Sequence, residues 1–159
     1  RLFHKNDYIL DLGASPGSWS QYCLEKIGPQ GLVVGVDLKP VEIKDPRFSF
    51  FRGDLREMSI DQLKVDRLFD SVLSDMAPST TGIRDVDQIR SFELCELALS
   101  VADKFLKPQG HFVCKLFHSD NFSDLRKMIE SKYAQFHAVK PDSTRKISKE
   151  IFLVGLRKK

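Results

Sequence analysis

YILDLGASPGSWSQ, residues 8–21, is the stretch that decides the fold of this chain. Its apolar run at 8–12 is typical of a buried strand, and Gly13 opens a turn where that strand ends. Over 18–27 the apolar residues recur at helical spacing, and a Gly-Pro pair follows them. The stretch therefore predicts a strand, a glycine-containing turn and a helix.

The same alternation continues along the chain. Further strands are expected at 32–36, 48–51, 69–74, 111–117, 136–140 and 151–156, and further helices at 58–65, 87–106 and 124–132. Strands that alternate with helices predict an α/β fold with a mostly parallel sheet of seven strands and helices on both faces. A polar basic loop joins the last two strands, so they should form an antiparallel edge. We expect residues 1–159 to form a single domain, since domains commonly run roughly 100 to 200 residues.

Composition narrows the classes of protein. Cys23, Cys95 and Cys114 are odd in number and lack C-x-x-C spacing, which argues against a disulfide framework and a zinc site. The four histidines are scattered, so we expect no bound metal. No apolar run approaches the roughly 20 residues that span a bilayer, and no signal peptide is visible. We therefore expect a soluble, cytoplasmic protein with no membrane partner. We also expect a monomer.

Glycine and aspartate stand where predicted strands end. Gly13, Asp37, Asp54 and Asp75 each follow or end a strand. In an open α/β sheet, ligands bind outside the carboxyl ends of the strands. The loop that begins at Gly13 lets the backbone approach a ligand closely, and Asp37 is placed to hydrogen-bond the ribose hydroxyls of a nucleoside cofactor.

The glycine spacing separates the candidate cofactors. Residues 13–17 read G-x-x-x-G, whereas the loop that cradles a dinucleotide pyrophosphate reads G-x-G-x-x-G, so an NAD-dependent oxidoreductase is disfavoured. S-adenosylmethionine (SAM) has no phosphates and carries a positive sulfonium and an amino group, which Asp11, Asp54 and Asp75 would favour. Each signal alone occurs in many folds, but the ordered set favours a SAM-binding protein.

Five segments then resemble one known family. DLGASPGSWSQ (11–21), GVDLKP (35–40), SDMAPS (74–79), VCKLF (113–117) and KPDSTRKISKEIFLV (140–154) resemble the FtsJ/RrmJ family of ribose 2'-O-methyltransferases, in order and over essentially the whole chain. The resemblance implies a Rossmann-like, SAM-dependent methyltransferase fold and an enzyme that methylates RNA. It also implies that SAM is contacted by Gly17, Trp19, Asp37, Asp54 and Asp75, to which the strand-end pattern adds Gly13 and Asp11. Without the family pattern, Trp19 would fit a core aromatic equally well.

The resemblance further implies the catalytic residues. In the family a Lys-Asp-Lys-Glu tetrad surrounds the target ribose, and three members match here as Asp75, Lys115 and Glu150, with Lys115 catalytic. The first lysine normally lies upstream of the first strand, and Lys5 is too close to that strand to match it, so we expect an N-terminal segment of the family to be missing. Taken alone, Lys115 would fit a strand-end lysine with its head in solvent.

The expected substrate is RNA. Arg145, Lys146 and Lys149 precede Glu150 and are placed to contact phosphates at the mouth of the site. The resemblance implies a ribose of large-subunit ribosomal RNA, a uridine, and hence a role in ribosome biogenesis, although the family also contains tRNA and mRNA-cap enzymes. A base-nitrogen methylase would carry Pro-Pro and an aromatic after Asp75, which this chain does not. A non-catalytic SAM- and RNA-binding module stays open as the alternative.

Overall fold

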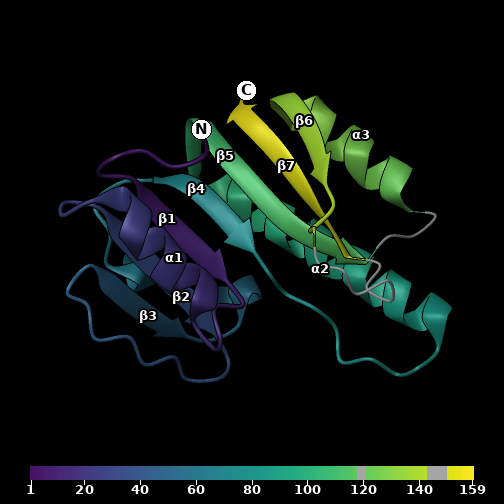
Figure 1. Ribbon diagram of the computed structural model, residues 1–159, viewed down its shortest axis with the longest axis horizontal. Helices are drawn as coiled ribbons and strands as arrows, with labels where there is room; N and C mark the ends of the chain where they lie inside the picture. The colour runs from purple at the N-terminus through teal and green to yellow at the C-terminus, as the bar shows by residue number, and fades with distance from the viewer. Residues whose placement is uncertain (118–120, 143–149) are drawn as a thin grey trace.

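Seven strands and three α-helices alternate along the chain in the computed structural model, which describes residues 1–117, 121–142 and 150–159 (Figure 1). In chain order the elements are β1 (Tyr8–Leu12), α1 (Ser18–Ile27), β2 (Leu32–Asp37), β3 (Phe48–Arg52), the 3-10 turns η1 (Leu55–Glu57) and η2 (Asp61–Leu63), β4 (Phe69–Ser74), α2 (Arg84–Phe105), β5 (Leu106–Phe117), α3 (Phe122–Lys132), β6 (Tyr133–Val139) and β7 (Glu150–Lys158).

All seven strands join one sheet in the order β3-β2-β1-β4-β5-β7-β6. The pairs from β3 across to β5 are parallel, whereas β7 is antiparallel to both β5 and β6. Figure 1 shows the arrowhead of β7 pointing opposite to those of β1 and β4. The mostly parallel seven-stranded sheet with an antiparallel edge is thus confirmed. The strand order reverses between β1 and β4, so the ends of these two strands flank the switch point where α/β sheets bind ligands.

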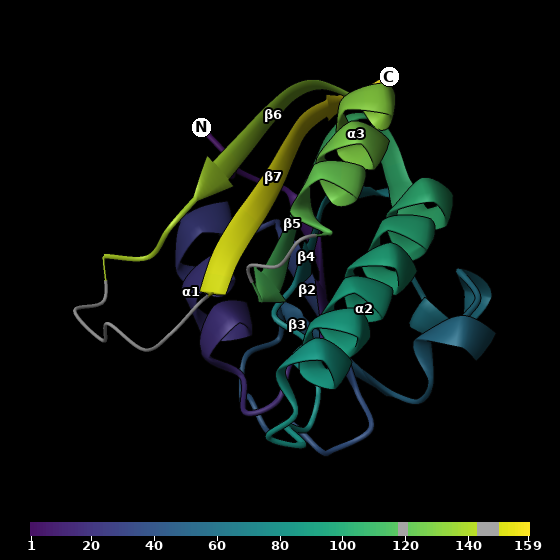
Figure 2. The same ribbon diagram turned by 90° about the vertical axis from the view of Figure 1, so that its right-hand side faces the viewer.

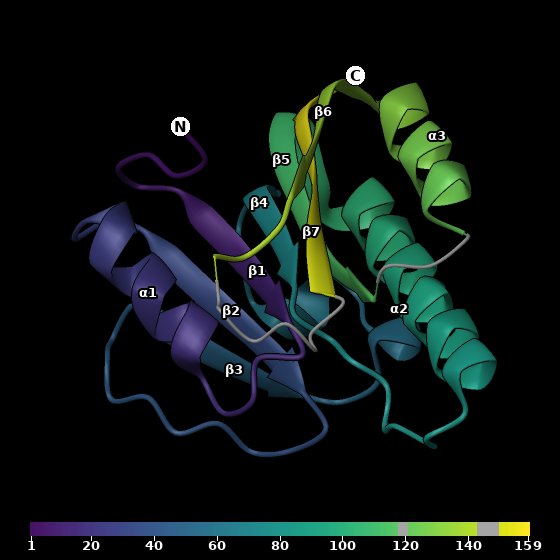
Figure 3. The same cartoon turned by 45° about the vertical axis from the view of Figure 1, so that its right-hand side comes forward.

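Helices cover both faces of the sheet, as predicted. Figures 2 and 3 show α1 on one face and α2 with α3 on the other. Side chains alternate along β1 accordingly: Ile9 packs with α1, whereas Leu10 and Leu12 pack in the larger core under α2 and α3. Because helices cover both faces, β1 and β4 are buried at almost every position, including the polar residues Asp11, Ser71 and Ser74.

One predicted helix is wrong. Residues 58–65 do not form an α-helix: the 3-10 turn η1 ends just before them, and only the short turn η2 lies within them. The residues buried here, Met58 and Leu63, are five positions apart, which does not match the three- and four-residue spacing of a helical face. Lys64 also adopts a left-handed backbone with φ 54°, which ends η2.

The start of the fifth strand also differs from the prediction. β5 begins at Leu106, directly after α2, whereas the sequence places its start at His111 after a Pro-Gln-Gly break. Leu106 pairs with Phe69 before the register shifts, and Gln109 in the shifted segment has φ 66°. Proline is tolerated in strands at such irregularities, so Pro108 interrupts the pairing without ending the strand.

Three further observations concern expected absences. Cys23, Cys95 and Cys114 are all buried and free of disulfides. Within the described ranges, no group of His, Cys, Asp and Glu side chains could hold a metal ion. No helix in the same ranges is long and apolar enough to cross a membrane.

Candidate active site

The loop after β1 is hydrogen-bonded to the end of β2. The backbone N–H groups of Gly13 and Ala14 both donate to the carbonyl of Val36, at 2.8 and 3.1 Å. Gly13 has φ 72°, and a Cβ added there would lie 2.5 Å from Cγ of Met76. Gly17, directly before α1, has φ 121°. Both positions therefore need glycine, Gly17 for its backbone conformation and Gly13 also for its close contact with Met76.

Asp37 at the end of β2 holds this loop from the other side. Its carboxylate accepts the backbone N–H of Ser15 through Oδ2 and that of Lys39 through Oδ1, each at 2.9 Å. A carboxylate has about four lone-pair sites, so Asp37 still has acceptors for a ligand. The loop and Asp37 thus form one preorganised unit at the switch point.

Asp11 lies beneath the loop and is fully buried. Its Oδ2 accepts a 2.6 Å hydrogen bond from Ser20 Oγ, and no donor in the described part of the chain reaches its Oδ1. Burial, with smaller contributions from the negative charges of Asp75 and Asp37, raises the pKa of the Asp11 carboxyl to about 7, against the lowering effect of the Ser20 hydrogen bond. Because Asp75 and Asp37 add negative charge beside Asp11, a cation bound here would stabilise the Asp11 carboxylate.

Ser20 is a residue that sequence reasoning missed. It lies on the buried face of α1 together with Cys23, Leu24 and Ile27. A serine three, four and seven positions before buried apolar residues is expected to be buried, and a buried hydroxyl needs a hydrogen-bond partner. This spacing could have pointed to a polar contact such as that with Asp11.

Trp19 and Asp54, two further predicted cofactor contacts, each have a partner within the protein. Trp19 is half-buried and packs against Phe152 of β7, with ring centroids 5.4 Å apart, beside an apolar pocket of about 300 Å³ that includes Leu73 and Val113. Asp54 caps η1 by accepting the N–H of Arg56 at 2.9 Å. The structure thus gives Trp19 a packing role and Asp54 a capping role, and it leaves both partly exposed.

Lys115, Asp75 and Glu150 come together at the ends of three neighbouring strands. Lys115 Nζ lies 3.1 Å from Oδ1 of Asp75 and 3.8 Å from Oε1 of Glu150. The register explains this meeting, because Ser74 pairs with Cys114 and Lys115 pairs with Phe152, two residues after Glu150. The Lys115 side chain is only 12% exposed, whereas those of Asp75 and Glu150 are 34% and 36% exposed. Lys115 is thus ion-paired and largely buried, not a solvated strand-end lysine.

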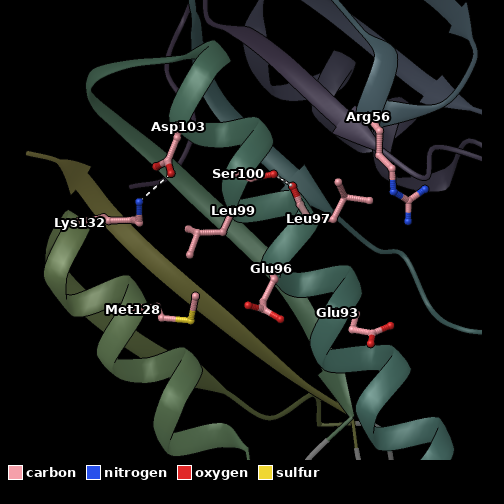
Figure 4. Close-up of a pocket in the computed structure, with 9 residues that line it drawn as sticks. All are labelled: Arg56, Glu93, Glu96, Leu97, Leu99, Ser100, Asp103, Met128 and Lys132. Carbon is pink, nitrogen blue, oxygen red and sulfur yellow. Dashed lines mark hydrogen bonds and ion pairs between the residues drawn. The ribbon is translucent and has the colours of Figure 1, made fainter.

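The three predicted RNA-binding residues, Arg145, Lys146 and Lys149, lie outside the described residues. A separate groove of about 560 Å³ lies between α2 and α3, on the face of the sheet opposite α1 (Figure 4). Its lining includes Glu93, Glu96 and an ion pair between Asp103 and Lys132. None of the predicted site residues that the structure describes lines this groove.

Comparisons with known proteins agree with this arrangement. The family model described as FtsJ-like methyltransferase matches residues 1–158. The chain is 57% identical over 163 residues to ribosomal RNA large subunit methyltransferase E of Bdellovibrio bacteriovorus, covering 100% of this chain and 83% of that protein. The protein of the same name from Desulfatibacillum aliphaticivorans is 44% identical over 161 residues, which cover 100% of this chain and 78% of that protein.

Solved structures show the same fold. A Plasmodium falciparum structure assigned as a ribosomal RNA methyltransferase aligns with a TM-score of 0.84 at 27% identity, over 97% of this chain and 87% of its own. Aeropyrum pernix fibrillarin in complex with SAM aligns with a TM-score of 0.68 at 16% identity. The alignment covers 96% of this chain and 67% of the fibrillarin chain. These alignments confirm the Rossmann-like fold of SAM-dependent methyltransferases. With the family model matching nearly every residue, the chain belongs to the FtsJ-like methyltransferase family.

Proposed function

We propose that this protein transfers a methyl group from SAM to a ribose 2'-hydroxyl of large-subunit ribosomal RNA, on a uridine. The observation that carries the proposal is the largely buried Lys115, held by Asp75 and Glu150 beside the acidic glycine-loop site. Relatives named ribosomal RNA large subunit methyltransferase E support the choice of RNA. We also propose that the protein acts in the cytoplasm as a monomer.

The residues present fit SAM as the cofactor. Asp37, already fixed by two loop N–H groups, would accept the ribose hydroxyls. Asp75, and the buried Asp11 with its unpaired oxygen, would stabilise the positive end of the cofactor, while Gly13 and Gly17 keep the loop backbone close. We assign Trp19 and Asp54 to the sides of the same site. When bound, SAM supplies the methyl group from a positively charged sulfonium.

Lys115 orients the reacting oxygen. The new O–C bond forms as the C–S bond breaks, and the hydroxyl loses its proton, so the reaction needs alignment and a proton acceptor. An ammonium has three donors and no acceptor, so in the ion-paired form Lys115 holds the 2'-oxygen, whereas a neutral Lys115 amine would serve as the base. The carboxylates of Asp75 and Glu150 keep the ammonium in place and supply the acceptor that the proton needs.

The RNA itself would be held through its phosphates. We assign this role to Arg145, Lys146 and Lys149, because phosphate contacts from basic side chains supply most of the affinity of proteins for nucleic acids. A reaction at the 2'-hydroxyl distinguishes RNA from DNA by itself, since DNA lacks that group.

The test is transfer of radiolabelled methyl from SAM to undermethylated large ribosomal subunits. We compare the wild-type chain, Lys115→Ala and a matched control, Lys104→Ala, which removes an exposed lysine of α2. The expected result is label on a ribose 2'-oxygen, lost by about 100-fold or more in Lys115→Ala at unchanged SAM affinity and kept in Lys104→Ala.

Other results would change the conclusion. Lys115→Ala activity within a few-fold of wild type would overturn the role of Lys115. Transfer to tRNA or capped mRNA in preference to ribosomal subunits would move the substrate to those classes. SAM binding without transfer to any RNA would identify a non-catalytic SAM- and RNA-binding module.

A further inference from the structure

The end of β5 that carries Lys115 extends beyond its neighbour β4. β4 ends at Ser74, which pairs with Cys114, and the chain then turns away through Asp75. The last three residues of β5, from Lys115 to Phe117, pair only with β7. Backbone N–H and C=O groups left unpaired in a buried position are destabilising, so this edge of β5 needs other partners.

Two side chains of α2 supply those partners. The backbone N–H of Phe117 donates to Ser91 Oγ at 2.9 Å, and Cys95 Sγ donates to the carbonyl oxygen of Lys115 at 3.0 Å. Ser91 and Cys95 are four residues apart, so they lie on one side of the helix, and each is only 2% exposed. In hydrogen-bonding terms, α2 takes the place of the missing strand.

Helix packing alone does not explain why residue 91 is a serine. The surrounding inward face of α2 is apolar and includes Ala98, Leu99 and Ala102. A hydroxyl buried on such a face is unfavourable unless it is hydrogen-bonded, and alanine would fill a small buried helical position without that requirement. The bond to Phe117 therefore accounts for a serine at this position.

We propose that Ser91 and Cys95 are positioning residues for methyl transfer. They fix the β5 backbone at Lys115 and two residues beyond it, and so hold Lys115 Nζ between Asp75 and Glu150. The inference rests on the proposed function, in which Lys115 orients the reacting oxygen. A misplacement of about 1 Å in a reacting group lowers rates by roughly 100-fold, so a smaller backbone shift should be measurable as a loss of kcat.

The experiment measures kcat, the KM for SAM and the thermal midpoint of four variants. Ser91→Ala and Cys95→Ala remove the two contacts, Ser91→Thr keeps the hydroxyl, and Val101→Ala trims another buried α2 side chain that is not bonded to β5. We expect kcat to fall about tenfold in Ser91→Ala and less in Cys95→Ala, with the KM for SAM unchanged. Ser91→Thr should recover most of the kcat, and Val101→Ala should lower the midpoint at unchanged kcat.

Lys115→Ala in the same assay separates the two proposals. Wild-type kcat in Ser91→Ala and Cys95→Ala, with activity lost in Lys115→Ala, would overturn the positioning role and leave the proposed function intact. Near wild-type activity of Lys115→Ala would overturn both. If Ser91→Thr does not fold, the comparison of Ser91→Ala with Val101→Ala decides, because equal losses of kcat in these two variants would mean a purely structural effect.

Discussion

Asp11→Asn should remove a pH dependence of stability that the buried carboxyl creates. The pKa of Asp11 is raised from 3.8 to about 7, chiefly by burial. Below about pH 4 the folded and unfolded chains both hold this proton. As pH rises from there, the unfolded chain releases the proton while the folded chain keeps it, so the free energy of unfolding falls until the pH passes the folded pKa near 7.

The size of the effect follows from the shift. Each unit of pKa difference corresponds to roughly 1.4 kcal/mol of free energy. The free energy of unfolding should therefore fall by on the order of 4 kcal/mol between about pH 4 and pH 7. Asparagine keeps the shape and an acceptor for the Ser20 hydroxyl, but it cannot ionise. Relative to wild type, Asp11→Asn should therefore gain about 3 kcal/mol of stability between roughly pH 5 and pH 8.

Urea unfolding of both proteins at several pH values measures this difference directly. Ser20→Ala is the matched control, because removing the hydrogen bond that lowers the Asp11 pKa should extend the loss of stability to higher pH. A difference between Asp11→Asn and wild type that stays constant within about 1 kcal/mol over this range would refute the reasoning.

Four further predictions concern other parts of the molecule. Gly13→Ala should destabilise the fold by about 1–3 kcal/mol and weaken SAM binding, because its φ is positive and its Cβ would meet Met76; an unchanged thermal midpoint would contradict this. Asp37→Ala should weaken SAM binding by about 10- to 100-fold in calorimetric titration, since it also frees two loop N–H groups. Asp70→Ala, at the opposite end of the sheet, should destabilise by roughly 2–4 kcal/mol in urea unfolding, through loss of two ion pairs and a backbone hydrogen bond, with kcat retained. Lys146→Ala should weaken RNA binding and reduce the slope of log affinity against log salt by about 1, and an unchanged slope would remove it from the phosphate contacts.

The position of the candidate site could be predicted from sequence, because it depends on local signals. Gly13, Asp37 and Asp75 follow short apolar runs, and parallel strands bring their carboxyl ends to one edge of the sheet. The family resemblance then supplied Lys115 and Glu150, which alternation of apolar and polar residues alone could not distinguish from solvated charges.

Long-range packing decided what the sequence left open. The insertion of β7 between β5 and β6 depends on pairing between distant segments, and the contacts of Ser91 with Phe117 and of Ser20 with Asp11 depend on how helices dock. The helix expected at 58–65 was wrong because short segments have little intrinsic helical stability, and burial of Met58 and Leu63 decides their conformation.

The place of β7 in the sheet also bears on how the protein is made. β7 follows the other strands of the described sheet along the chain, yet it lies between β5 and β6 and brings Glu150 to Lys115. While the ribosome is still adding these residues, the nascent chain presents an open edge of β5, the kind of edge that invites pairing with other chains. Completion of the Lys115 site and protection of this edge from aggregation should therefore occur together, when β7 fills the gap between β5 and β6.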